Sequence, residues 1–208
     1  MPRPQSLEVR RALIERAAAL LARRQPVTLT SLVEGCGVST MAVYTYFDGM
    51  AGLWSAVRQE GFTRLATRLG AVRLGRDAVR HLAALGVAYT ENALMNPDLY
   101  RVMFDSLFDL PDPAAAAAAF DPLVVGAREA QAAGRFKEDL VPDDFAIQYW
   151  ASGHGVTSLT VTGVLSPTDL RRHAPVVTTA LFVAAGDDPR RAQASVEAAW
   201  RQSTIGRP

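Results

Sequence analysis

Apolar residues recur at spacings of three and four along most of this chain, which is the period of one face of an α-helix. The clearest stripe predicts one long helix over residues 50–70, and it consists of Leu53, Trp54, Val57, Phe62, Leu65 and Leu69. Further helices are predicted over 77–95, after Pro97, over 114–133, after Pro142, over 168–185 and from Pro189 to 202. The pattern therefore predicts an all-α fold.

Proline and glycine mark where these helices begin and end. Asn96-Pro97-Asp98 ends one helix and opens the next, because proline suits the first turn of a helix. Gly134 is placed to end the helix over 114–133, within which Pro122 predicts an interruption or a kink. The alanines over 114–119 favour a helix without a function of their own.

The first fifty residues predict two short helices joined by a tight turn. A leading helix over 7–24 is followed by Thr28, which can cap a short helix over 29–35. Gly37 can take a positive φ and turn the chain sharply, and Ser39 can cap the helix that follows. This order of elements is that of a helix-turn-helix.

The second short helix has one apolar face and one outward face. Leu32 and Val33 are predicted to pack against Val38, Val43 and Phe47. The side chains left to point outward are those of Thr40, Met41, Tyr44, Thr45 and Tyr46. The alternative is an ordinary helical hairpin whose tyrosines are half-buried core residues.

These positions, with Leu53 downstream, resemble the N-terminal domain of the TetR family of transcriptional regulators over about residues 7–58. The resemblance implies a helix-turn-helix DNA-binding domain over 1–49, a connecting helix over 50–70, and a C-terminal helical ligand-binding and dimerisation domain over 71–208. It also implies double-stranded operator DNA as a partner. The DNA-contacting residues expected by this resemblance are Thr28, Ser39, Thr40, Met41, Tyr44, Thr45 and Tyr46.

The chain departs from the family pattern at three positions of this domain. The family often has a small residue where Met41 stands, a histidine where Tyr46 stands and a lysine where Met50 stands. The change at Met50 removes a cation that typically touches phosphate in the family. Arginines elsewhere or the N-terminal segment must then supply some of the affinity for the DNA backbone.

The distribution of charge agrees with a DNA-binding N-terminal region. The whole chain of 208 residues has a formal net charge of only +1. Residues 1–70 hold nine arginines and five acidic residues, a surplus of +4, so that the remainder carries −3. A basic head on a mildly acidic body is typical of a DNA-binding domain joined to a sensing domain. The alternative is that Arg16, Arg23 and Arg24 form only the solvated face of the first helix.

A second resemblance lies in the C-terminal half. Trp150, His154 and Gly155 resemble the Trp-His-Gly signature of one class of TetR C-terminal domains. Trp150 and His154 share a helical face, while Gly153 and Gly155 allow another helix to approach closely. Candidate walls of a ligand pocket are Tyr89, Met103, Phe104, Trp150 and His154. The alternative for each is plain core, with His154 as a hydrogen-bonded core histidine.

A homodimer is predicted on two grounds. In the family, two C-terminal helices of each subunit form a four-helix bundle with the partner, and the resemblance assigns this role to residues 144–163 and 168–185. On physical grounds, the apolar faces of these helices would otherwise be exposed to water.

Other functional classes find little support in the sequence. One cysteine, Cys36, and three scattered histidines predict neither a disulfide nor a metal site, and no cofactor motif is found. No nucleophile elbow, phosphate loop or paired acids predict catalysis, so that no catalytic residue is expected. The N-terminus lacks the apolar core of a signal peptide and no apolar run is long enough to span a bilayer, which predicts a cytoplasmic protein.

The sequence thus predicts a homodimeric repressor that a small hydrophobic molecule releases from its operator. Two alternatives remain open. One is a helical dimeric interaction module that does not read DNA, and the other is a small helical enzyme with His154 as its base.

Overall fold

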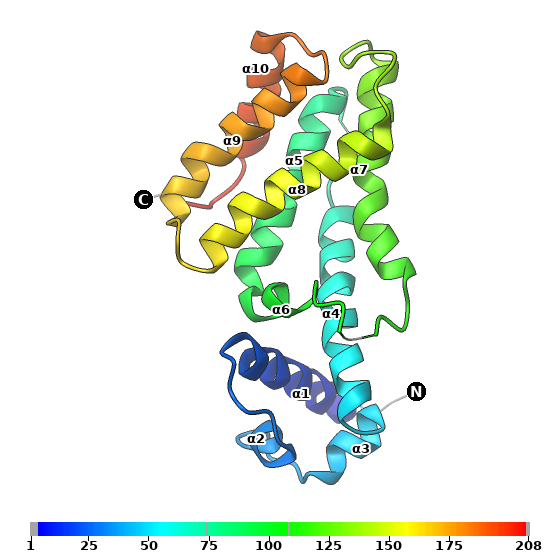
Figure 1. Cartoon of the computed structure of the whole chain (residues 1–208), viewed down its shortest axis with the longest axis vertical. Helices are drawn as coiled ribbons and strands as arrows, with labels where there is room; N and C mark the ends of the chain where they lie inside the picture. The colour runs from blue at the N-terminus through cyan, green and yellow to red at the C-terminus, as the bar shows by residue number, and fades with distance from the viewer. Residues whose placement is uncertain (1–3, 74, 108, 207–208) are drawn as a thin grey trace. The chain divides into compact units, whose positions relative to one another are not determined.

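The computed structural model describes residues 4–73, 75–107 and 109–206, and within these ranges the chain forms helices and no strand. The helices, coloured along the chain in Figure 1, are α1 (Pro4–Ala22), α2 (Leu29–Val33), α3 (Met41–Phe47), α4 (Met50–Gly70), α5 (Ala78–Met95), α6 (Pro97–Val102), α7 (Ala114–Ala132), α8 (Pro142–Val161), α9 (Pro167–Ala184) and α10 (Pro189–Trp200). The predicted all-α fold is confirmed, and α4 has the predicted bounds.

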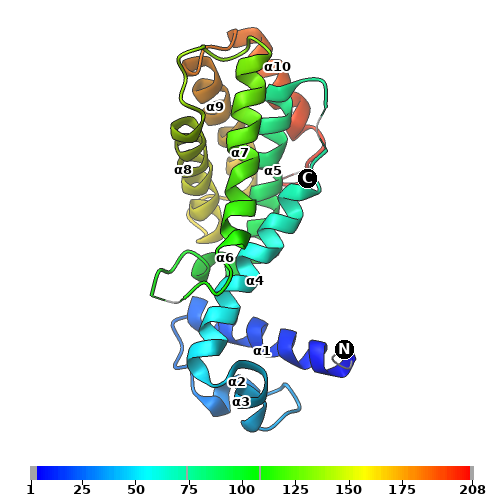
Figure 2. The ribbon, with the colours of Figure 1, turned by 90° about the vertical axis from the view of Figure 1, so that its right-hand side faces the viewer.

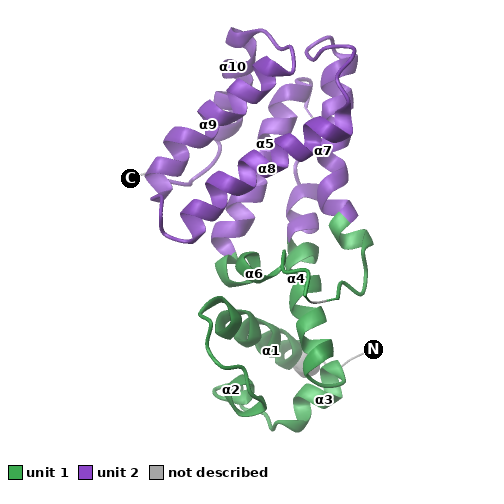
Figure 3. Cartoon of the chain, in the orientation of Figure 1, with its two compact units in different colours: residues 1–64, 96–116 green, residues 65–95, 117–208 purple. Residues whose placement is uncertain are grey.

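The chain forms two compact units (Figure 3). Unit 1 comprises Met1–Arg64 and Asn96–Ala116, and unit 2 comprises Leu65–Met95 and Ala117–Pro208. The expected domains, 1–49 and 71–208, stay a prediction. The compact units divide the chain differently, because α4 is shared between them and the segment with α6 belongs to unit 1.

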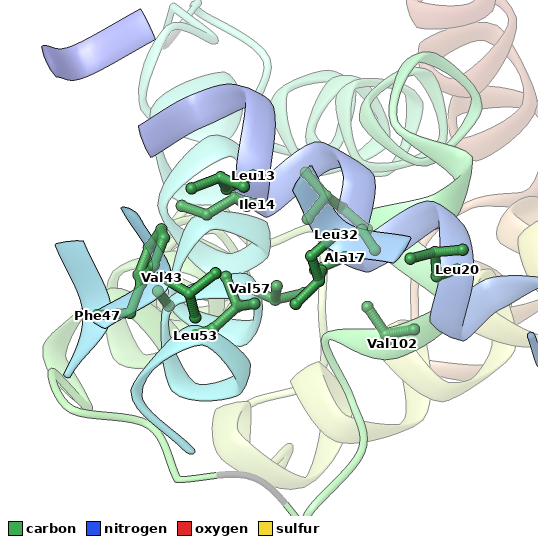
Figure 4. Close-up of a cluster of buried hydrophobic side chains, with 13 residues drawn as sticks. Leu13, Ile14, Ala17, Leu20, Leu32, Val43, Phe47, Leu53, Val57 and Val102 are labelled. Atoms are coloured by element: carbon green, nitrogen blue, oxygen red, sulfur yellow. The ribbon is translucent and has the colours of Figure 1, made fainter. Parts of the chain in front are cut away.

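Unit 1 has an apolar core to which each of its first four helices contributes (Figure 4). Leu13 and Ile14 of α1 are fully buried, and so are Leu32 of α2, Val43 of α3 and Leu53 of α4. The same cluster includes Leu99 and Val102, because α6 packs on α1. The core therefore fixes the helix-turn-helix against α1 and α4.

Arginines reinforce this packing from the surface. The Arg16 side chain donates to the carbonyl oxygen of Ser31 at 3.0 Å and to the Glu34 carboxylate at 3.2 Å, which joins α1 to α2. Arg64 donates to Glu60 at 2.7 Å and to Glu15 at 3.0 Å, which joins α4 to α1. These arginines have structural roles in unit 1.

Unit 2 is built around α5, which packs against α8 and α10, while α8 also packs on α9. Figure 2 shows α5 beside α7, and at this contact Gly126 lies directly against the Leu82 side chain. Phe136, Phe145, Tyr149 and Phe182 form an aromatic cluster with ring centroids 4.9 to 6.1 Å apart. Such offset and tilted pairs contribute beyond their buried area.

A buried ion network ties one end of unit 2 together. The Arg135 guanidinium donates twice to the Asp187 carboxylate, at 2.5 and 2.6 Å, and once to Asp77 at 3.0 Å. Asp77 also accepts from the hydroxyl of Ser195 at 2.6 Å. One guanidinium therefore holds two segments that lie far apart in the sequence: the start of α5, and α10 with the turn before it.

Two sequence predictions about α7 have different outcomes. Gly134 has the positive φ expected of a residue that ends a helix, at +65°. Helix α7 runs through Pro122 as one helix, so the predicted interruption is wrong, and the alternative of a kink stays a prediction. Proline removes one hydrogen bond from the ladder, and burial of Leu123, Val124 and Ala127 on the same helix offsets that loss.

Candidate DNA-binding and ligand-binding sites

Local hydrogen bonds begin α2, and two glycines turn the chain between α2 and α3. The Thr28 hydroxyl accepts from the Ser31 backbone N–H at 3.1 Å, and the Ser31 hydroxyl accepts from the Thr28 N–H at 2.9 Å. This capping box confirms Thr28 as the cap of α2. Gly35 and Gly37 follow with φ of +78° and +68°, a region that glycine adopts without strain.

The predicted cap of α3 by the Ser39 side chain is wrong. Thr40 precedes α3 and already has helical dihedral angles, φ −58° and ψ −25°. The Ser39 and Thr40 carbonyl oxygens accept from the N–H groups of Ala42 and Val43, at 3.0 and 3.2 Å. These backbone bonds satisfy the donors that a capping hydroxyl would otherwise serve.

Helix α3 buries one face and exposes the other. Val43 and Phe47 lie in the core of unit 1, whereas the Met41 side chain is 63% exposed and Tyr44 is 51% exposed. Thr45 is also exposed, and its hydroxyl donates to the Met41 carbonyl oxygen at 2.9 Å. The core therefore fixes the direction in which the Met41 and Tyr44 side chains point.

Two residues expected to point outward are only partly exposed to solvent. Tyr46 is half-buried and packs against the core of unit 1, with its ring centroid 6.4 Å from that of Phe47. Thr40 is half-buried as well. A helix with 3.6 residues per turn cannot expose Tyr44, Thr45 and Tyr46 equally while it buries Val43 and Phe47.

Several arginines of unit 1 already serve its own packing. The Arg10 guanidinium lies over the Phe47 ring, 5.5 Å from its centroid, and Arg58 donates to the Met103 carbonyl oxygen at 3.2 Å. Arg23 and Arg24 are exposed, and their side chains have no ion pair within the described residues. The surplus charge of residues 1–70 is thus less available to DNA than the sequence suggests.

Three of the five candidate pocket residues come together in unit 2. The Tyr89 hydroxyl lies 2.8 Å from Nδ1 of His154, and the Trp150 ring lies edge-on to His154 with centroids 6.2 Å apart. Phe120 of α7 adds another ring, 6.3 Å from Trp150. Burial lowers the pKa of His154, so that its neutral form predominates near pH 7.

Sequence reasoning missed two threonines beside this cluster. The hydroxyls of Thr90 and Thr157 are 3.1 Å apart and buried between α5 and α8. Thr90 follows Tyr89 directly, and Thr157 lies one helical turn beyond His154. Polar residues at these positions in otherwise apolar helix faces were the available signal.

Met103 and Phe104 do not join this cluster. Both belong to unit 1, where Met103 is fully buried and Phe104 lies edge-on to Phe62 and Tyr100. An added Cβ at Gly61 of α4 would lie 2.6 Å from Cβ of Met103, so the two backbones approach closely. Both residues therefore pack against neighbours within unit 1, and their role as pocket walls stays a prediction.

The outer face of α8 is apolar and open in the single chain. Ile147 and Leu159 of α8 are exposed, as is Val176 of α9. Gly153 and Gly155 have no atom within 4 Å of the position a Cβ would take. The close approach that these glycines permit is therefore not used by another helix of the same chain.

Two further features are absent from the described residues. Among them, no group of three or more histidine, cysteine, aspartate or glutamate side chains is arranged to hold a metal ion. None of the described helices is both long enough and apolar enough to cross a membrane.

The fold is that of a helix-turn-helix protein. A turn sets the short, exposed helix α3 on an apolar core, and the long helix α4 follows into a second helical unit. Residues 82–181 match the family model described as "Tetracyclin repressor-like, C-terminal domain". With the fold, this match supports a transcriptional regulator of the TetR family. Comparison with curated protein sequences gave no match.

Solved structures share the fold over most of the chain. A protein of unknown function from Rhodococcus sp. RHA1 is 24% identical, with 96% of each chain covered and a TM-score of 0.63. A regulatory protein of the TetR family from Rhodococcus RHA1 is 20% identical over 90% of this chain and all of its own, with a TM-score of 0.70. RolR in complex with the ligand resorcinol is 18% identical over 92% of this chain and 94% of its own, with a TM-score of 0.55.

Proposed function

We propose that the chain acts as a homodimeric, ligand-responsive repressor that reads operator DNA with α3. The observation that carries this proposal is the fixed outward face of α3. Val43 and Phe47 anchor the helix in the core of unit 1, and Met41 and Tyr44 project from it. Base readout requires side chains held in a fixed direction on a helix that enters the major groove.

The chemistry of the exposed side chains suits direct contact with bases and phosphates. Met41 offers an apolar tip for a thymine methyl group, and Tyr44 offers a ring and a hydroxyl. Thr28 lies at the start of α2 and Ser39 lies in the turn before α3, and hydroxyls at helix starts can bind phosphate and set the register of the protein on the duplex. Thr45 contributes less, because its hydroxyl donates to the Met41 carbonyl oxygen. Tyr46 and Thr40 contribute from half-buried positions.

The apolar outer face of α8 and α9 supports a homodimer. Exposed Ile147, Leu159 and Val176 would be removed from water by a second copy, and the open space at Gly153 and Gly155 permits close approach of a partner helix. Recognition helices of such dimers bind two half-sites about 34–36 Å apart.

Tyr89, Trp150 and His154 are the proposed ligand contacts. Two aromatic side chains and a largely neutral imidazole suit a small aromatic ligand with a hydrogen-bonding group. The complex of RolR with resorcinol supports this chemical class. The ligand acts through α4, whose residues belong to both units, and it shifts the equilibrium only as far as it prefers one conformation.

The first experiment titrates the purified protein against labelled DNA that flanks its own gene, with random duplex as the control. Met41→Ala and Tyr44→Ala are compared with Met95→Ala, which truncates a similarly exposed methionine far along the chain, in α5. Truncation of an α3 side chain that touches a base is expected to weaken operator binding by about 1–3 kcal/mol. Met95→Ala is expected to leave the affinity unchanged.

The outcomes separate this proposal from its alternative. Specific binding by two protomers per site, weakened by both α3 variants and by resorcinol-like ligands, supports a ligand-controlled operator-binding protein. If both α3 variants bind every DNA as the wild type does, base readout by α3 is wrong. Binding no better than to random duplex, together with a stable dimer, favours the interaction module.

A further inference from the structure

Unit 2 contains a cavity of about 800 Å³ that none of the proposed ligand contacts lines. Its walls come from the last turn of α4, the connection to α5, one face of α5 and the end of α10. Arg73, Arg76 and Arg80 line it, and so does the hydroxyl-bearing Ser203. We call this space the basic cavity.

Both acidic residues of the basic cavity are already paired. Glu91 forms an ion pair with Arg68 and accepts from the Ser203 hydroxyl at 2.9 Å. Asp77 accepts from Arg135 at 3.0 Å, as part of the buried ion network. These acids therefore do not neutralise the remaining arginines of the cavity.

Arg73, Arg76 and Arg80 are exposed, and their side chains form no ion pair or hydrogen bond within the described part of the chain. Three like charges lie on one short stretch, so each disfavours its neighbours. An anion that binds between them relieves this repulsion. The planar guanidinium fork matches phosphate oxygens in pairs, and a dianion offsets more of the charge than a monoanion.

The remaining wall is apolar and built from small side chains. Ala84, Val87 and Ala88 share one face of α5, and Ala199 of α10 lies on the same cavity. The volume falls within the range of small-molecule sites, about 300–1,000 Å³. The cavity therefore has room for an apolar body beside a charged group.

We propose that the basic cavity binds a small organic phosphate. The phosphate lies among Arg73, Arg76 and Arg80, and the apolar part of the ligand lies against α5 and α10. This site is separate from the proposed ligand contacts Tyr89, Trp150 and His154. Tyr89 lies on the α8-facing side of α5, opposite the basic cavity, and Trp150 and His154 belong to α8.

The position of the basic cavity also predicts an effect on regulation, and this part rests on the proposed function. Arg68 in the last turn of α4 lines the cavity, and α4 continues toward the N-terminus as part of the DNA-binding unit. A ligand that holds this turn therefore favours one arrangement of α4 over another. Binding itself does not depend on DNA, so the two parts are tested separately.

The binding test is calorimetric titration of the full-length protein with phenyl phosphate at pH 7.5, without DNA. Inorganic phosphate and benzoate are the comparison probes, since the first lacks the apolar body and the second carries a single charge. The test variant is Arg73→Gln/Arg76→Gln/Arg80→Gln, which removes only exposed charges. Arg190→Gln is the matched control, because Arg190 is an exposed arginine outside the cavity. Ala84→Leu fills the apolar wall without changing any charge.

Phenyl phosphate is expected to bind once per protomer, at least about tenfold more tightly than either comparison probe. The triple variant and Ala84→Leu are each expected to weaken it at least tenfold, and Arg190→Gln is not. Circular dichroism checks that all variants remain folded. Absence of binding by phenyl phosphate overturns the proposal, as does equal binding by wild type and triple variant.

Nucleic acid is the competing partner for exposed arginines. If the triple variant loses affinity for random duplex while phenyl phosphate does not bind, the arginines contact DNA and the proposal is wrong. If phenyl phosphate binds as expected but leaves operator affinity unchanged, the site stands and its regulatory effect is refuted. If the protein binds no DNA specifically, the proposed function is refuted. The titration with phenyl phosphate remains valid, because it is carried out without DNA.

Discussion

Arg135 offers the sharpest test of how unit 2 is held together. Its side chain is 6% exposed and that of Asp187 is 1% exposed, so the pair is almost fully removed from water. Arg135→Ala would leave the Asp187 carboxylate buried without its cation. Breaking a buried ion pair in this way costs about 3–5 kcal/mol. That is a large fraction of the roughly 5–15 kcal/mol by which a folded domain is stable.

The expected result is measured by urea unfolding at a fixed protomer concentration, followed by circular dichroism. With a slope of about 2–3 kcal/mol per molar urea, the midpoint should fall by about 1–2 M. Arg128→Ala is the control, because Arg128 and Asp143 form an exposed pair at 3.5 Å whose loss should cost less than about 1 kcal/mol. The double variant Arg135→Met/Asp187→Leu removes both charges and should recover most of the stability.

A loss of under about 1 kcal/mol in Arg135→Ala would refute this reasoning, and so would a double variant less stable than the single one.

The network also predicts a pH dependence through Asp77. Burial alone would raise the pKa of Asp77, but hydrogen bonds from Ser195 and backbone N–H groups and the charge of Arg135 outweigh it and lower the pKa. Stability from Asp77 is therefore present above its usual pKa of 3.8 and is lost as the pH falls through the lower folded value.

Three further predictions concern single positions. Gly52→Ala places a Cβ 1.8 Å from the Phe47 carbonyl oxygen, so the stability of unit 1 should fall by about 1–3 kcal/mol or more. The loss should appear as faster hydrogen exchange of the core amides of unit 1, and unchanged exchange would contradict this. The Cβ of Gly153→Ala has no neighbour within 4 Å apart from the backbone of its own helix. The variant should therefore stabilise the protomer by about 1 kcal/mol yet weaken the dimer in sedimentation experiments. An unweakened dimer would exclude Gly153 from the interface. Burial lowers the pKa of His154, so the fold should lose stability as the pH falls below 6.5 and the imidazole becomes protonated. His154→Gln should flatten this part of the profile of stability against pH. An unaltered profile would assign the dependence to other groups.

Local sequence rules predicted the elements of the helix-turn-helix well. Thr28 is the cap of α2, and Gly37 has the positive φ expected of the turn. Both features depend on a few neighbouring residues. Ser39 failed as a cap because the helical angles of Thr40 let backbone carbonyls satisfy the free donors. One dihedral angle decided that outcome, and the sequence does not specify it.

Contacts between distant segments were less predictable. The Tyr89 hydroxyl reaches His154 in unit 2, whereas Met103 packs against α4 in unit 1, which only the path of α6 determines. The sequence did not predict the basic cavity, because arginines in a connection between helices are usually only solvated. Its acids are neutralised by Arg135 and Arg68, and these partners lie 58 and 23 residues away in the sequence.

The return of residues 96–116 to unit 1 bears on how TetR-type regulators exchange their parts. A chimera joined once, after Arg64, would take α1 to α4 without α6 and would strip Leu99 and Val102 from the core they complete. The chain passes between the units three times, so a working transplant needs three junctions. Under the proposed function, new specificity in such a protein is reached more readily by substitution on α3 than by recombination of whole units.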